Sequence, residues 1–153
     1  MSHIIPGKLY LGNVVNVNRL QWLDQHNIQT IICVASCRDV VIRDEIRACK
    51  TVHQFEIIDN GHQILDFDPI VQLIEESMVR GSVLVNCAVG ISRSASFVIA
   101  YLMKTQHMSL DAAFALVKRA RPKIQPNPSF MAQLRNYEAS MNIHRCRNSV
   151  QEI

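Results

Sequence analysis

Long apolar runs are missing from this 153-residue sequence, and so are the features of a secretory signal. No run reaches the roughly 18 apolar residues that a membrane-spanning helix needs. The opening residues Met1, Ser2 and His3 lack the charged and apolar regions of a signal peptide. We therefore expect a protein of the cytoplasm, or also of the nucleus, with no membrane partner.

A strong excess of one charge is missing too. The chain has 16 lysines and arginines against 13 aspartates and glutamates, which gives a formal net charge of +3. Nucleic-acid-binding domains carry a concentrated basic surface, whereas the basic residues here are scattered. We expect no nucleic-acid partner, while a phosphorylated, acidic substrate is compatible with this charge.

Paired cysteines are also absent. The five cysteines stand at positions 33, 37, 49, 87 and 146, an odd number without the spacing of a disulfide framework or a zinc site. Cys33 and Cys37 lie close together, but no histidine near them completes a set of metal ligands. We expect reduced thiols and neither a metal nor a cofactor.

Glycine and proline are few, at five each, while 48% of the residues are hydrophobic and 19% are charged. This balance is typical of a globular protein rather than of a disordered chain. A chain of this length can bury roughly two-thirds of its unfolded surface, enough for one core. The sequence predicts one domain over residues 1–142, a flexible tail over residues 143–153, and a monomer or weak dimer.

Apolar periodicity predicts both strands and helices, and therefore the α/β class. Interior or alternating patterns predict strands over residues 28–34, 52–58 and 82–86. The opening segment 4–12 is expected to form a turn and then a short strand at a sheet edge.

Helices are expected at five places. An amphipathic pattern predicts one over residues 16–26, and a nearly all-apolar pattern predicts a core helix over residues 94–104. Capping residues predict three other helices. One starts at Asp68 and Pro69 and ends near Arg80. One starts at Ser109 and runs towards Ala120, and one starts at Asn127 and Pro128.

The segment after strand 82–86 carries the main chemical signal. Cys87 and Arg93 are separated by five residues, which are Ala88, Val89, Gly90, Ile91 and Ser92. A buried strand leads directly into this segment, Gly90 permits an unusual backbone angle, and a helix begins at Arg93. Successive backbone amides of such a loop can point inward at the oxygens of a phosphate, assisted by the positive end of the helix.

Spacing alone does not support this interpretation, because Cys37 and Arg43 have the same separation. The β-branched residues 40–42 between them resist the curled backbone that an anion site needs. Asp39 in the same segment would repel a phosphate. Only the Cys87 loop combines the spacing with a suitable context.

An electropositive loop of this kind favours the thiolate form of its cysteine. Cysteines so placed have pKa values of roughly 3.5 to 7.5, against about 8.5 when free. The Cys87 thiolate can then attack phosphorus in line, while the loop amides and Arg93 stabilise charge on the equatorial oxygens. The hydroxyl of Ser94 can hydrogen-bond the sulfur when a phosphocysteine is hydrolysed. No metal is required.

Three blocks of the sequence resemble the small dual-specificity protein phosphatases of the cysteine-dependent protein tyrosine phosphatase superfamily. They are IIPGKLYLGN (4–13), VLVNCAVGISRSAS (83–96) and RPKIQPNPSFMAQLRNYE (121–138). The resemblance implies a central, mostly parallel sheet of about five strands flanked by helices. It also implies hydrolysis of phosphotyrosine and of phosphoserine or phosphothreonine in protein substrates, through a phosphocysteine intermediate.

The resemblance implies roles for individual residues as well. Cys87 falls at the nucleophile, Arg93 at the phosphate clamp, and Ser94 at the hydroxyl that assists breakdown of the phosphoenzyme. Asp59 falls at the general acid, which protonates the leaving oxygen and later accepts a proton from water. Asn127 matches the asparagine that braces the phosphate loop, although capping of a helix is an equally good interpretation.

Three other residues compete with Asp59 for the role of the acid. Asp68 is better explained as a helix cap, and Asp66 lies beside the same helix start. His62 is near the same loop, but an exposed loop histidine is more often only solvated. The sequence therefore favours Asp59.

Asn86 departs from the family pattern, which has a histidine immediately before the nucleophile. That histidine is a hydrogen-bonding brace for the loop, and asparagine offers amide donors without an imidazole. We expect a raised pKa for Cys87 and slower turnover, without loss of activity. Asn86 also keeps open an alternative function, a low-turnover module that binds phosphoproteins.

A further alternative is hydrolysis of phosphoinositides or of RNA 5′-phosphates. Such polyanionic substrates favour a basic loop, whereas residues 88–91 add no lysine. The reactive cysteine also predicts reversible inactivation by peroxide, in which Cys33, Cys37 or Cys49 would act as the second thiol.

Overall fold

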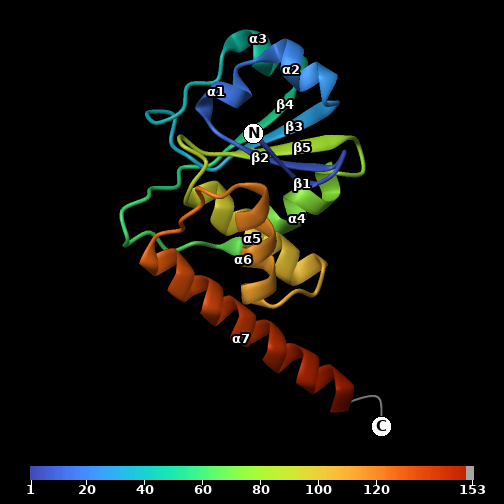
Figure 1. Ribbon diagram of the computed structural model, residues 1–153, viewed down its shortest axis with the longest axis vertical. Helices are drawn as coiled ribbons and strands as arrows, with labels where there is room; N and C mark the ends of the chain where they lie inside the picture. Colours follow the sequence, from blue (N-terminus) through green and yellow to red (C-terminus); the bar gives the residue numbers. More distant parts are fainter. Residues whose placement is uncertain (151–153) are drawn as a thin grey trace.

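The chain folds around one five-stranded sheet with helices on both sides, as the computed structural model shows (Figure 1). The structure describes the backbone of residues 1–150 and the side chains of residues 1–142. The strands are β1 (Ser2–Ile5), β2 (Leu9–Gly12), β3 (Ile28–Cys33), β4 (Thr51–Gln54) and β5 (Ser82–Asn86). The helices are α1 (Val14–Val17), α2 (Leu20–Gln25), α3 (Asp44–Cys49), α4 (Phe67–Ser77), α5 (Arg93–Thr105), α6 (Leu110–Ala120) and α7 (Pro128–Val150). The predicted α/β class, with about five mostly parallel strands flanked by helices, is confirmed.

The sheet brings the ends of four parallel strands together. Its order is β1-β2-β5-β3-β4, and β1 alone runs antiparallel to its neighbour. Gly12 pairs with Asn86, Asn86 with Cys33, and Cys33 with Gln54. The segments that follow β2, β5, β3 and β4 therefore start at one edge of the sheet, where open α/β sheets place their ligand sites.

Helix α5 lies on the side of the sheet opposite α1, α2 and α3 (Figure 1). Residues 93–103 are all buried, and the helix packs against α4, α6 and α7. The fully buried ring of Phe97 meets Phe67 of α4 edge-on, with 5.6 Å between the ring centres. Because close packing on all sides fixes this helix, its first turn is a rigid platform for Arg93 and Ser94.

The N-terminal segment differs from the prediction of one short strand at a sheet edge. β1 and β2 form an antiparallel hairpin whose turn contains Gly7 at a φ of 68°. β1 takes the edge, so β2 lies between β1 and β5 with all of its residues buried. The apolar residues 9–11 explain this arrangement, because they need cover on both faces of the sheet.

Two predicted elements differ from their patterns, because one is divided and the other is shorter. The helix predicted over residues 16–26 is divided into α1 and α2, because a capping box between Asn13 and Asn16 starts α1 and the helix stops at Asn18. The strand predicted over residues 52–58 ends at Gln54, where its pairing with β3 ends. Helix α3 occupies a charged segment for which the periodicity predicts no element.

The start of α4 corrects the predicted role of Asp68. The N-cap residue is Asp66, and the helix ends at Ser77, also earlier than predicted. Asp68 lies in the first turn, where its Oδ1 accepts hydrogen bonds from Lys104 Nζ and Tyr137 Oη, both at 2.6 Å. These contacts lower the pKa of Asp68. Its side chain therefore joins α4 to α5 and α7 instead of capping α4.

The other two predicted caps are confirmed. Ser109 Oγ accepts the backbone N–H of Ala112 at 3.2 Å and opens α6. Asn127 Oδ1 accepts the backbone N–H of Phe130 at 2.8 Å and opens α7. Both helices begin where a polar side chain satisfies a free amide of the first turn.

Helix α7 continues past residue 142, where the sequence predicts the end of the domain. The side chains of residues 143–150 and all of residues 151–153 lie outside the described part of the chain, so the flexible tail stays a prediction. None of the helices in the described residues has both the length and the apolar character to cross a bilayer.

Candidate active site

The loop from Cys87 to Arg93 joins β5 to α5 at the carboxyl edge of the sheet. Cys87 is buried, with 2% of its surface exposed. Its Sγ lies 3.1 Å from Ser94 Oγ and accepts the backbone N–H of Gly90 at 3.2 Å. Both groups can donate hydrogen bonds to a thiolate, so the sulfur lies at the base of the loop with two partners for negative charge.

The backbone of the loop is held from outside. The carbonyl of Ile91 accepts the N–H of Gln125 at 2.9 Å. Gly90 has a φ of 72°, and a Cβ at this position would collide with the carbonyl oxygen of Gly12. Glycine is therefore required here both for the backbone angle and for the close approach of β2.

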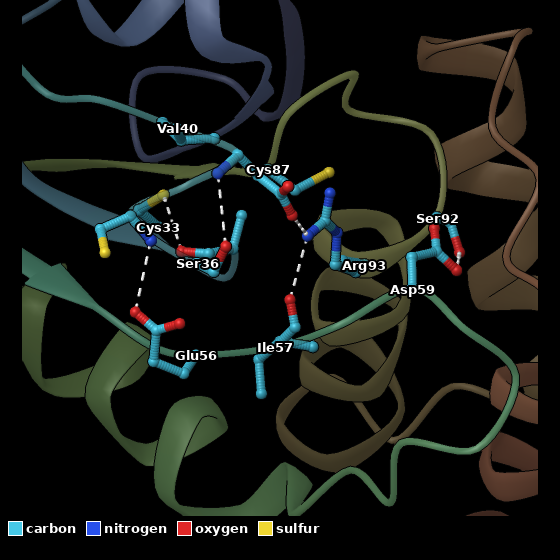
Figure 2. A network of polar contacts seen from close by, with 12 residues as sticks. Cys33, Ser36, Val40, Glu56, Ile57, Asp59, Cys87, Ser92 and Arg93 are labelled. Atoms are coloured by element: carbon cyan, nitrogen blue, oxygen red, sulfur yellow. Dashed lines mark hydrogen bonds and ion pairs between the residues drawn. The ribbon is translucent and has the colours of Figure 1, made fainter.

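Arg93 is 7% exposed and lines the same cavity as Cys87. Figure 2 shows the two side chains close to each other. Arg93 Nη1 donates to Asp39 Oδ2 at 2.5 Å and to the carbonyl of Ile57 at 3.0 Å. These two contacts occupy both hydrogens of Nη1 and leave Nε and Nη2, a pair of donors that can bind two phosphate oxygens side by side. The guanidinium is therefore oriented before a phosphate arrives.

Asp39 is a site residue that the sequence did not reveal. From the sequence it belongs only to the Cys37 segment, where it would repel a phosphate. Asp39 lies in the segment that follows β3. Because β3 ends beside β5, this segment starts next to the Cys87 loop, and Asp39 comes within reach of Arg93. The order of the strands decides this contact, and the residue pattern of one sequence contains no signal for that order.

Asp59 lies next to the loop, in the segment that follows β4. Its Oδ1 accepts the hydroxyl of Ser92 at 3.2 Å (Figure 2). The same oxygen accepts the side-chain amide of Asn127 at 2.6 Å. Asp59 lines the cavity together with Cys87 and Arg93. The structure therefore brings the predicted acid, nucleophile and clamp to one cavity.

The three competing acids lie elsewhere and do not line this cavity. Asp68 is paired with Lys104 and Tyr137, and a carboxyl group whose pKa is lowered is a poor proton donor near neutral pH. Asp66 is exposed at the start of α4, and His62 is exposed in the preceding loop.

Asn127 connects three parts of the site. Its backbone N–H donates to Ser92 Oγ at 3.0 Å, and its side-chain amide donates to Asp59. Its Oδ1 caps α7 through Phe130. The loop contact and the helix cap, which the sequence leaves as alternatives, therefore occur together.

Asn86 lies behind the loop and is fully buried. Its Nδ2 donates to Cys33 Sγ at 3.6 Å, while its Oδ1 has no hydrogen-bond partner within the residues that the structure describes. Burial raises the pKa of Cys33 to about 11. The Asn86 side chain is thus directed at β3, and its effect on the reactivity of Cys87 stays a prediction.

The cavity above the sulfur has a volume of about 250 Å³. Its lining residues are Asp59, Cys87, Val89, Ile91, Ser92, Arg93, Gln125 and Asn127. Gln125 is the second residue that sequence reasoning missed, because it carries no motif of its own. In the described part of the chain, no group of three or more His, Cys, Asp or Glu side chains could hold a metal ion. The arrangement suits an anion the size of a phosphate group.

The sequence of this chain is similar to those of known proteins. Residues 9–140 match the family of the dual specificity phosphatase catalytic domain. The chain is 38% identical to dual specificity protein phosphatase 1 of Arabidopsis thaliana, over 92% of this chain and 70% of that protein. It is 36% identical to dual specificity protein phosphatase Mpk3 of Drosophila melanogaster, over 92% of this chain and 34% of that protein. The chain thus spans only about a third of the length of Mpk3.

A solved structure shares the fold. The human tyrosine phosphatase-like serine/threonine/tyrosine-interacting protein superposes with a TM-score of 0.85 at 36% identity, over 92% of this chain and 97% of that chain. The family match covers most of the chain, including the whole Cys87 loop. This chain therefore belongs to the family of the dual specificity phosphatase catalytic domain.

Proposed function

We propose that this chain hydrolyses the phosphate monoesters of phosphotyrosine and of phosphoserine or phosphothreonine in protein substrates. The observation that carries the proposal is the single cavity that Cys87, Arg93 and Asp59 line together. A nucleophile, a phosphate clamp and an acid are the groups that phosphoryl transfer to sulfur needs. Membership of the family supports the same reaction.

In the first step, the Cys87 thiolate attacks phosphorus from the base of the loop. An S–P bond forms while the P–O bond to the leaving side chain breaks, and Asp59 gives its proton to the leaving oxygen. The loop amides bind the equatorial oxygens, and the free Nε and Nη2 of Arg93 add a bidentate contact.

In the second step, water hydrolyses the phosphocysteine. The Asp59 carboxylate accepts a proton from the attacking water, a new P–O bond forms and the S–P bond breaks. Ser94 Oγ, at 3.1 Å from the sulfur, donates a hydrogen bond that stabilises the departing thiolate. Inorganic phosphate leaves, and Cys87 returns to its starting state.

Three variants test these roles with an aryl phosphate and with phosphopeptides. Cys87→Ser is expected to abolish turnover, and Asp59→Asn is expected to lower kcat by about 10²- to 10⁴-fold, the usual contribution of a general acid. Asp66→Asn is the matched control, because it removes an exposed carboxylate outside the cavity and should keep the wild-type rate. Hydrolysis by Cys87→Ser at the wild-type rate would contradict the mechanism.

An exposed residue in the lining of the cavity supports acceptance of both kinds of phosphorylated residue. The cavity encloses about 250 Å³, and Val89 at its rim is 55% exposed. We expect a shallow entrance, which would let the short side chains of phosphoserine and phosphothreonine bring their phosphate to Cys87, whereas a deep one would admit only phosphotyrosine. We expect turnover of phosphotyrosine and phosphoserine peptides that are otherwise identical in sequence. Activity on the phosphotyrosine peptide alone would contradict the proposed dual specificity.

Asn86 favours a second candidate, a module that captures phosphoproteins with little turnover. Its side chain contacts Cys33, and its buried oxygen has no partner among the described residues, so we do not expect it to replace the brace that a histidine would supply. Turnover of phosphopeptides that depends on Cys87 excludes this candidate. Tight phosphopeptide binding by the wild type without turnover would establish it in place of the hydrolase.

Phosphoinositides and RNA 5′-phosphates suit the site less well. The lining residues include one basic side chain, Arg93, and the carboxylate of Asp39 lies directly beside it. Further phosphate groups on a substrate would meet that negative charge. We therefore expect higher kcat/KM on phosphopeptides than on phosphoinositides or RNA 5′-triphosphates, and the reverse order would reassign the substrate class.

A further inference from the structure

We infer that Arg121 is a positioning residue of the reaction, which fixes the backbone of the Cys87 loop and supplies a buried positive charge beneath it. The inference rests on the proposed function and adds a residue to its machinery. Arg121 is 5% exposed and follows the last turn of α6. It lines no part of the cavity, so it acts through the loop and not on the substrate.

The Arg121 guanidinium binds two consecutive carbonyls of the loop. Its Nε donates to the carbonyl of Gly90 at 2.6 Å, and its Nη2 donates to the carbonyl of Val89 at 3.1 Å. The neighbouring carbonyls are also occupied, that of Ala88 by the N–H of Val14 and that of Ile91 by the N–H of Gln125. Arg121 therefore supplies two of the four anchors between residues 88 and 91.

These anchors decide where the loop amides point. In a planar trans peptide the C=O of one residue and the N–H of the next point in opposite directions. Binding of the Val89 carbonyl by Arg121 therefore turns the N–H of Gly90 inward, where it donates to Cys87 Sγ at 3.2 Å. Binding of the Gly90 carbonyl directs the N–H of Ile91 inward in the same way.

The charge of Arg121 has no carboxylate partner in the residues described, since none of the salt bridges there includes it. Buried cations are normally paired, because an isolated one loses its hydration. Burial lowers the pKa of Arg121, and the negative charge of Cys87 opposes that effect. The anion inside the loop, thiolate or phosphate, is therefore the counter-charge that the fold provides for Arg121.

A purely structural role predicts something different from this inference. If Arg121 only fills space between α6 and the loop, its replacement lowers stability and leaves the anion affinity of the folded protein unchanged. If it positions the amides, its replacement weakens anion binding in protein that is still folded. The two roles are therefore separated by measurements on the folded fraction.

Two variants divide the contribution of geometry from that of charge. Arg121→Lys keeps the positive charge but cannot bind two carbonyls through a planar fork, whereas Arg121→Gln removes the charge as well. Arg119→Gln is the matched control, because Arg119 is exposed in the last turn of α6, close to Arg121 in the chain but outside the site. Wild type, both variants and the control are compared by thermal melting, by kcat on an aryl phosphate and by the inhibition constant of inorganic phosphate.

We expect kcat to fall about tenfold in Arg121→Lys and about a hundredfold in Arg121→Gln, since loss of one direct oxyanion donor costs about 10²- to 10³-fold. The inhibition constant of phosphate should rise in the same order, and Arg119→Gln should match the wild type. The inference would be overturned if folded Arg121→Lys had the wild-type kcat and the wild-type inhibition constant of phosphate. This variant keeps the test decisive if Arg121→Gln does not fold.

A chemical readout is independent of turnover. The ratio of the Cys87 alkylation rates by anionic iodoacetate and neutral iodoacetamide measures the positive field at the sulfur. We expect this ratio to fall severalfold in Arg121→Gln and to stay near wild type in Arg119→Gln. If wild type shows no turnover, the proposed function fails while the ratio still tests Arg121; an unchanged ratio in folded Arg121→Gln contradicts the buried-charge role.

Discussion

The carboxylate of Asp39 and the guanidinium of Arg93 form an ion pair, with 2.5 Å between Oδ2 and Nη1. The two residues are 54 positions apart in the chain. The side chain of Arg93 is 9% exposed and that of Asp39 is 42% exposed, so the pair joins a buried cation to a partly solvated anion. Asp39 therefore has two opposite effects on a phosphate, because it orients Arg93 and also repels the bound anion.

Two substitutions of Asp39 separate these effects. Asp39→Asn keeps an oxygen acceptor and removes the charge, so the inhibition constant of inorganic phosphate should fall about fivefold, the equivalent of about 1 kcal/mol for a partly exposed charge. Asp39→Ala removes the acceptor too, so the guanidinium loses its orientation and kcat should fall about tenfold. Asp44→Asn, at an exposed position of α3, is the control for a general change in charge. An unchanged inhibition constant of phosphate in Asp39→Asn and an unchanged kcat in Asp39→Ala would together exclude a role for Asp39.

Asn127 allows the loop contact and the helix cap to be tested apart. Serine is also a good N-cap residue but is too short to repeat the 2.6 Å contact with Asp59. Asn127→Ser should therefore lower kcat and leave the melting temperature close to wild type. Asn127→Ala should lower kcat equally and also destabilise the protein by about 1 kcal/mol, through loss of the α7 cap. Equal kcat values for wild type and both variants would mean that the contact with Asp59 has no part in turnover.

Asn86→His tests whether asparagine before the nucleophile slows the reaction. An imidazole has ring N–H donors, whereas the buried Asn86 oxygen can only accept and has no partner within the residues that the structure describes. We expect kcat to rise about fivefold, which corresponds to one hydrogen bond of about 1 kcal/mol. Asn86→Ala, which removes the amide and adds no ring, should show no gain. A kcat for Asn86→His at or below that of the wild type would contradict the expectation.

Cys33 should be unreactive at neutral pH in the folded protein. Burial raises its pKa from an ordinary 9.0 to about 11, so the folded state favours the neutral thiol. The stability that this preference contributes is fully present below pH 9 and is lost as the pH rises through 11. At pH 8, iodoacetamide should label the exposed Cys37 and Cys49 and leave Cys33 unlabelled, as peptide mass spectrometry can determine. Rapid labelling of Cys33 at pH 8 would refute the raised pKa. Slow labelling would also mean that Cys33 is a poor second thiol for a disulfide with an oxidised Cys87.

Much of the site was predictable because its signals are local. The apolar run of β5 and the cysteine, glycine and arginine that follow it lie within twelve residues, and Ser94 comes next. A local segment of this kind folds in the same way wherever the sheet places it, so the loop, its glycine and the start of α5 agree with prediction. The caps at Ser109 and Asn127 agree for the same reason.

The predictions that failed depend on neighbours. Asp68 has the pattern of a cap but is drawn to Lys104 and Tyr137, which lie on other helices. The strand at residues 9–12 has the length of an edge strand but lies inside the sheet, because β1 covers it. In both cases a tertiary contact replaced the local preference.

The sequence by itself determined the Cys87 loop, because backbone preference, strand and helix signals for it occur in one continuous segment. The family resemblance also assigned Asp59 and Asn127 to the site, but only the tertiary structure decided that further residues reach that loop. Asp39, Arg121 and Gln125 come from segments distant in the chain, and they meet Arg93 and the loop carbonyls because the strand order and the packing of α6 bring those segments to one edge of the sheet. Such contacts form when apolar strands and helices find cover on both faces, a requirement of the whole fold that no short pattern encodes.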